Sequence, residues 1–119
     1  QKGHDILIIP CQFGLRHRGR SVRQAREVMN ANEFGLGSFA VGCMILTHPE
    51  REVKWEQLHI DCAGDEFYPS AGGQFSRAPY FLWYGGGLEF GTYDVSDAND
   101  NYGSASGFAP QQNPCHLRV

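Results

Sequence analysis

The feature that most constrains the fold is a pair of β-rich runs joined by three glycines. The runs "APYFLWY" (residues 78–84) and "LEFGTYD" (residues 88–94) flank Gly85-Gly86-Gly87. Two such runs with a glycine turn between them predict an antiparallel β-hairpin. Before the hairpin, "WEQLHIDC" (residues 55–62) alternates in polarity, which predicts a half-buried strand with Leu58, Ile60 and Cys62 on one face and His59 and Asp61 on the other. After it, "SASGFAP" predicts a short final strand.

The pattern before Trp55 is helical. Ser21 and Gln24 have the spacing of a capping box, so a helix is expected from about Val22 to Asn32. The apolar run "SFAVGCMILT" (residues 38–47) predicts a second helix, capped by Ser38 and ended before Pro49, with a buried strand as the alternative. "DILIIP" (residues 5–10) predicts a strand. The expected fold is α+β, with residues 1–119 forming a single domain in which two helices pack on a small, mostly antiparallel, loop-rich sheet.

Length and cysteine usage exclude some classes of protein. The most apolar run is about ten residues long, against the roughly twenty that cross a bilayer, so no membrane span is expected. The four cysteines show no metal-ligand spacing and are compatible with two disulfides or with reduced thiols; they are Cys11, Cys43, Cys62 and Cys115. Cys11 with Cys115 is the favoured pairing, because chain ends often lie close together. Disulfides would indicate an extracellular or cell-surface protein, and reduced thiols a cytoplasmic one.

A basic cluster suggests nucleic-acid binding. Residues 1–54 carry eight Lys/Arg and five Asp/Glu, whereas residues 55–119 carry two and eight. Arginines beside a histidine could bind phosphate groups and support acid–base chemistry on RNA. The candidate phosphate-binding residues are Arg16, His17, Arg18, Arg20, Arg23 and Arg26. An RNA- or DNA-binding protein, or a small RNase, is therefore the alternative function, although a solvated helix face also explains these arginines.

Two acidic groups can be tested as metal sites. Asp97, Asn99 and Asn101 fit the first half of the helix–loop–helix calcium pattern, but Tyr102 and Phe108 occupy the positions that require Gly and Glu, which excludes that motif. Asp61, Asp65 and Glu66 surround Gly64 and form a looser candidate site, for which Ca²⁺ would be the cofactor. Solvated loop carboxylates are the alternative, and no other cofactor is indicated.

The segment order resembles that of small prokaryotic C-type-lectin-like domains, which include retroelement-diversified variable proteins and the related formylglycine-generating fold. A first helix ("SVRQAREVMN"), a segment ending in "THPE", a Trp-led strand, a hairpin and a closing "YGSASGF" carry this resemblance. It implies a non-catalytic module that presents a Tyr/Asn/Asp/Ser-rich C-terminal surface to a protein or glycan ligand. Such side chains suit recognition, because Tyr brings contact area and Ser and Asn adapt their hydrogen bonds. The residues that match this surface are Tyr84, Tyr93, Asp94, Ser96, Asp97, Asn99, Asp100, Asn101 and Tyr102.

Overall fold

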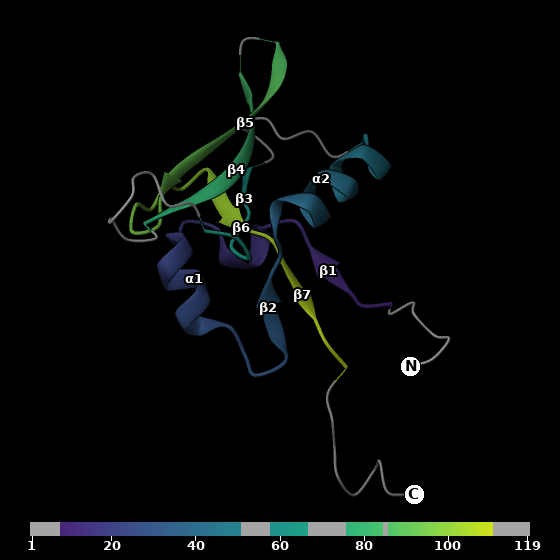
Figure 1. Cartoon of the computed structure of the whole chain (residues 1–119), viewed down its shortest axis with the longest axis vertical. Helices are drawn as coiled ribbons and strands as arrows, with labels where there is room; N and C mark the ends of the chain where they lie inside the picture. Colours follow the sequence, from purple (N-terminus) through teal and green to yellow (C-terminus); the bar gives the residue numbers. More distant parts are fainter. Residues whose placement is uncertain (1–7, 51–57, 67–75, 85, 111–119) are drawn as a thin grey trace, which may run out of the picture.

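The computed structural model describes residues 8–50, 58–66, 76–84 and 86–110 and shows an α+β protein, as predicted (Figure 1). Two α-helices and a short 3₁₀ helix accompany mostly antiparallel strands. In chain order the elements of the described ranges are β1 (Cys11–Gln12), η1 (Leu15–His17), α1 (Val22–Val28), β2 (Glu33–Gly35), α2 (Ser38–Thr47), β3 (His59–Asp61), β4 (Arg77–Tyr84), β5 (Gly87–Asp94), β6 (Tyr102–Ser104) and β7 (Ser106–Phe108).

The strands form two sheets rather than the one expected. A three-stranded sheet has the order β1-β7-β2 and is antiparallel, and a four-stranded sheet has the order β5-β4-β3-β6. In the second sheet β3 and β6 pair in parallel, while the β3–β4 and β4–β5 pairs are antiparallel. The predicted hairpin is confirmed: β4 and β5 pair along their whole length, from Arg77 opposite Asp94 to Tyr84 opposite Gly87.

A single residue joins the two sheets near the C-terminal end. Ala105 separates β6 from β7 and is fully buried. Its amide donates to the Asp61 carbonyl, and its carbonyl accepts from the Leu36 amide. The segment "YGSASGF" therefore pairs with both sheets, and in Figure 1 it runs through the middle of the molecule.

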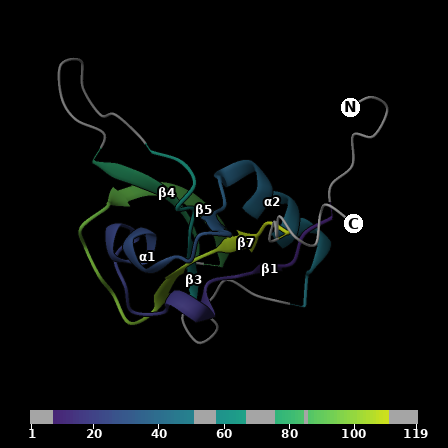
Figure 2. The same cartoon turned by 90° about the horizontal axis from the view of Figure 1, so that it is seen from below.

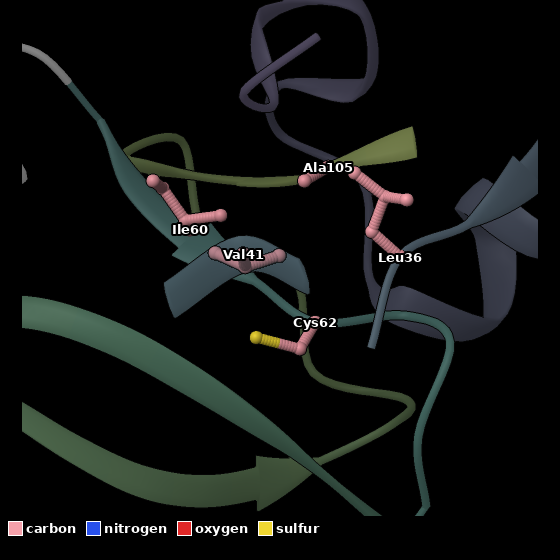
Figure 3. Close-up of a cluster of buried hydrophobic side chains, with 5 residues drawn as sticks. All are labelled: Leu36, Val41, Ile60, Cys62 and Ala105. Carbon is pink, nitrogen blue, oxygen red and sulfur yellow. The ribbon is translucent and has the colours of Figure 1, made fainter. Parts of the chain in front are cut away.

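The helices cover opposite faces of the four-stranded sheet. On α2, Val41 belongs to a buried cluster with Leu36, Ile60, Cys62 and Ala105, against which Phe81 packs (Figure 3). On α1, Val22 packs in a second cluster with Ala63, Ala78 and Val95. Ala78 and Phe81 are three residues apart on β4, so their side chains point to opposite faces. The two helices accordingly lie apart in the turned view of Figure 2. Burying each large apolar side chain contributes about 1.5–3 kcal/mol.

The start of α1 follows the sequence pattern, but its end does not. The capping box is present, with the Ser21 side chain accepting from the Gln24 amide and the Gln24 side chain accepting from the Ser21 amide. The helix ends at Val28 instead of continuing to Asn32, because Met29 adopts an extended backbone and the chain then enters β2. Tertiary pairing of β2 with β7 overrides the weak helical preference of the asparagines.

Two strand predictions need correction. His59 and Asp61 do not face solvent: helices cover both faces of the sheet that contains β3, and the two residues are only 5% and 4% exposed. The strand expected over residues 5–10 lies partly outside the described residues, and residues 8–10 are not in a strand. The first strand in the described residues is the shorter β1, which pairs with β7 at the centre of the three-stranded sheet.

The favoured disulfide is also wrong. Cys11 carries a free thiol, as do Cys43 and Cys62, while Cys115 lies outside the described residues. These three thiols belong to separate parts of the fold: Cys11 is exposed on β1, Cys43 is exposed on α2 and Cys62 is in the core. Burial raises the pKa of the Cys62 thiol above its ordinary value, helped by the nearby carboxylates of Asp61 and Asp65. No helix within the described ranges is long and apolar enough to cross a membrane.

Candidate functional site

The most connected polar group in the described structure is a buried carboxylate, Glu33, at the start of β2. Its Oε2 accepts from His17 Nε2 at 2.6 Å and from Ser106 Oγ at 2.7 Å. Its Oε1 accepts from Arg16 Nε at 3.3 Å and from the Asn30 amide at 3.4 Å. Burial opposes ionisation, but the hydrogen bonds from Ser106, His17 and Asn30 outweigh it and hold the pKa of Glu33 below its ordinary value.

Gln12 extends this network to the Ser106 hydroxyl and to the main chain of two elements, β6 and η1. Its Nε2 donates to Ser106 Oγ at 2.8 Å and to the Ser104 carbonyl at 2.9 Å. Its Oε1 accepts from the amides of Gly14 and Arg16, so it holds the start of η1. The Glu33 network, defined as Glu33, His17, Ser106 and Gln12, therefore fixes η1 against β2 and β7.

A close backbone contact places η1 at this position. Gly14 has φ +133°, and a Cβ added there would lie 2.7 Å from the carbonyl oxygen of Gly103 on β6. Glycine tolerates both the backbone conformation and the short separation. The basic residues that follow Gly14 are thus held next to the C-terminal strands.

His17 has both ring nitrogens engaged inside the protein. A guanidinium can only donate, so the 3.1 Å contact from Arg20 Nη1 makes His17 Nδ1 an acceptor. The proton then lies on Nε2, which donates to Glu33. With an exposure of 1%, His17 orders its neighbours rather than offering a ring nitrogen to a substrate.

The predicted arginine cluster is spread over several roles. Arg26 donates to the carbonyls of Ala63 and Asp65 and pairs with Glu66 at 2.6 Å, which joins α1 to the segment after β3. Arg18 Nε donates to the Asp100 carbonyl, and the exposed Arg23 lies near the carboxylate of Asp94. Arg16 and Arg20 instead flank His17 at an open hollow.

The predicted Tyr/Asx surface is a loop that is ordered by its own hydrogen bonds. Asp94 accepts from the amide and hydroxyl of Ser96, and these bonds lower the pKa of the Asp94 carboxyl. Asn99 Oδ1 accepts from the Asn101 amide at 2.9 Å, and the Asn99 carbonyl accepts from the Tyr102 amide. The bonds to the side chains of Asp94 and Asn99 form Asx turns, in which the side chain takes the place of a backbone acceptor.

The predicted tyrosines lie in two separate places. Tyr93 stacks on Tyr102 with ring centroids 5.5 Å apart, and Tyr80 contacts both rings edge to face. Burial raises the pKa of Tyr102 to about 12, with smaller contributions from Tyr80, Asp61 and Tyr93. Tyr84 lies at the opposite end of β4 from Arg77, the residue that pairs with Asp94, so the fold separates it from the loop. Its side chain is 71% exposed.

The fold brings the loop and the basic segment together. Besides the Arg18 contact with Asp100, the Gly19 amide donates to the Tyr102 carbonyl and the Arg23 amide donates to the Val95 carbonyl. Residues 94–101 therefore lie directly beside the segment that carries Arg18 and Arg23. Part of the Tyr/Asx group and part of the arginine group, which the sequence offered as alternatives, thus form one composite face, defined here as residues 94–101 with Arg18 and Arg23.

The three carboxylates proposed as a metal site have separate partners or surroundings. Asp61 is buried on β3, Asp65 binds the start of α2, and Glu66 pairs with Arg26. Within the described ranges, no group of three or more His, Cys, Asp or Glu side chains could hold a metal ion. A Ca²⁺ site at these residues stays a prediction that the described geometry does not favour.

Asp65 is expected to stabilise α2 as a cap supplied by a distant segment. Asp65 Oδ2 accepts from the Ser38 amide at 2.7 Å and from the Ser38 hydroxyl at 2.8 Å. Asp65→Ala removes both acceptors and should lower the free energy of unfolding by about 1–2 kcal/mol, measured by urea denaturation. Asp97→Ala, in an exposed loop, is the control. A Ca²⁺-dependent rise in the wild-type melting temperature that Asp65→Ala abolishes would instead favour a metal site.

Sequence patterns carry no signal for the Glu33 network. Glu33, Ser106 and Gln12 were not among the candidate residues, because each stands in a short strand without a motif around it. His17 was a candidate, but its partner is 16 positions further along the chain. Only the pairing of β2 and β1 with β7 brings these residues together.

Comparison with known proteins found no match: no family model, curated protein or solved structure corresponds to this chain. The fold itself defines the class as a small α+β protein. The resemblance to C-type-lectin-like domains stays a prediction.

Proposed function

We propose that the protein is a non-catalytic ligand-binding module that uses the composite face. The observation that carries this proposal is the ordering of residues 94–101 by Asx turns and by hydrogen bonds from Arg18, α1 and β3. The side chains of Ser96, Asp97 and Asp100 nevertheless face solvent. A loop that is ordered before binding loses less conformational entropy when a ligand arrives.

The state of His17 supports a binding role over a catalytic one. A general acid or base must reach the proton that it transfers, either directly or through one water. His17 is buried and both ring nitrogens are committed to Arg20 and Glu33. The Glu33 side chain has an exposure of 0% and is saturated with donors.

The mixed charge of the composite face favours a protein or glycan over a nucleic acid. Arg18 and Arg23 supply cationic donors, whereas Asp97 and Asp100 supply carboxylates on the same loop system. A polyanion gains from neighbouring cations but is repelled by carboxylates beside them. Polar ligands that offer both donors and acceptors match this pattern.

The proposal is tested with the full chain, immobilised and exposed to a glycan array and to proteins from the source cells. We expect a retained ligand whose affinity falls at least tenfold in Asp97→Ala, Asp100→Ala and Arg18→Ala variants, since central interface side chains often contribute more than about 1 kcal/mol. Glu89→Ala, an exposed carboxylate on β5, is the matched control and should bind as the wild type does.

Two results would contradict the composite face. One is that nothing is retained, or that the loop variants retain a ligand as well as the wild type does. The other is binding of a short RNA or DNA at low salt that weakens steeply as salt is added and that is lost in Arg18→Ala and Arg20→Ala. That second result would establish the alternative function.

A further inference from the structure

An open hollow lies beside the buried Glu33 network and is lined by residues that the composite face does not use. Arg16, His17, Arg20 and Val28 line it, and its volume is about 270 Å³. One water molecule needs roughly 15 Å³ on a comparable measure, so the hollow admits a polyatomic group. Its lining places it between η1, which carries Arg16 and His17, and Val28 at the end of α1.

Both guanidiniums at the hollow are held in place by a few of their donors. Arg16 uses Nε for Glu33, and its guanidinium carbon lies 5.5 Å from the centre of the Phe108 ring. Arg20 uses Nη1 for His17 Nδ1 and for the Arg16 carbonyl. The two terminal nitrogens of Arg16, and Nε and Nη2 of Arg20, make no hydrogen bond to any residue in the described ranges. The two guanidinium groups are thus held in a fixed orientation, and most of their N–H groups are available to donate to an acceptor.

The charge at the hollow is positive. Its lining contains two arginines and no carboxylate. The nearest acid in the network, Glu33, has a side-chain exposure of 0% and lies behind His17, to which it is bonded. An acceptor arriving from solvent therefore meets guanidinium groups first.

We propose that this hollow is a binding site for one phosphate or sulfate group. A tetrahedral oxyanion offers several acceptor oxygens in different directions, and guanidinium forks on two different side chains can engage it together. The site, defined as Arg16 and Arg20 over His17, is separate from the composite face and does not depend on the function proposed for it.

The test is a titration of the full chain with sodium phosphate, methyl phosphate and sodium sulfate, with total ionic strength kept constant by sodium chloride. Binding is followed by NMR through the Nε–H resonances of the arginines. We expect saturable shifts of the Arg16 and Arg20 signals with at least one oxyanion, and an affinity at least tenfold lower in Arg20→Ala. Arg23→Ala, an exposed arginine that does not line the hollow, should change the affinity by less than twofold.

Comparing phosphate, methyl phosphate and sulfate shows whether the site binds a phosphate ester or a free inorganic anion. Binding of methyl phosphate supports a site for a phosphate ester, whereas binding of only the inorganic ions supports a site for the free anion. No saturable shift with any of the three, or equal losses in Arg20→Ala and Arg23→Ala, would overturn the proposal.

A second variant tests the proposal in case Arg20→Ala does not fold. Arg16→Gln removes a lining guanidinium while leaving the contact between Arg20 and His17 in place, and it should also weaken binding about tenfold. Asp100→Ala should leave oxyanion binding unchanged, because Asp100 belongs to the composite face. Failure of the oxyanion site and failure of the proposed function can therefore be told apart.

Discussion

Replacing Glu33 by alanine is expected to lower the free energy of unfolding by about 3–5 kcal/mol. The carboxylate accepts from His17, Ser106, Arg16 and the Asn30 amide, and its side chain has an exposure of 0%. Truncation leaves the buried His17 and Ser106 donors without their acceptor and removes the negative charge beside Arg16. Since small domains are stable by about 5–15 kcal/mol, a large part of the total would be lost. Urea denaturation at neutral pH measures the effect.

Two further variants define the cause of that loss. Glu27→Ala removes an exposed carboxylate from α1 and should change stability by less than about 0.5 kcal/mol. Glu33→Gln keeps one acceptor oxygen and should lie between wild type and Glu33→Ala. A loss in Glu33→Ala no larger than that in Glu27→Ala would show that the Glu33 network does not stabilise the fold.

Local patterns in the sequence predicted the elements whose stability is also local. The β4–β5 hairpin needs only two β-rich runs and a turn, and the start of α1 needs only Ser21 and Gln24. For α2, the run from Ser38 to Thr47 was correctly assigned to a helix. Its cap was not: the N-cap residue is Gly37, and Asp65, 27 positions after Ser38, supplies the acceptor.

Features that depend on distant pairing could not be predicted in the same way. The alternation around β3 correctly separates Ile60 from His59 and Asp61, but alternation alone does not say whether the polar face meets water. The structure buries that face because a helix packs on each side of the four-stranded sheet. The arginines of residues 16–26 look like one cluster in the sequence, whereas the fold gives Arg26 a structural role and separates Arg16 and Arg20 from Arg18.

Burial of Asp61 should make stability fall as pH rises, and Asp61→Asn should abolish that effect. Burial raises the pKa of Asp61 to about 7 from an ordinary value of 3.8. A carboxyl with a raised pKa binds its proton more tightly in the folded state. The stability that this proton gives is therefore fully present below pH 3.8 and is lost as pH rises through about 7. Each unit of pKa shift corresponds to about 1.4 kcal/mol, so the full loss is about 4 kcal/mol.

The amide introduced by Asp61→Asn resembles the protonated acid in shape and stays neutral at every pH. The variant should therefore match the wild type near pH ~4 and exceed its stability by about 2–4 kcal/mol near pH ~8. Two parallel series of urea denaturation curves between these pH values measure the difference. Asp97→Asn removes an exposed carboxylate and should give a difference from wild type that does not change over this range.

The prediction tests one physical cause of the pH dependence: the Asp61 carboxylate is removed from water and gains no hydrogen-bond donor in return. Burial is the cause of the raised pKa, and no hydrogen bond from the described part of the chain offsets it. Ser104, the partner of Asp61 in register on β6, has a fully buried hydroxyl that bonds to no residue in the described ranges. A pH-independent difference between Asp61→Asn and the wild type would mean that the carboxylate is ionised in the fold at neutral pH, so that a donor must reach it there.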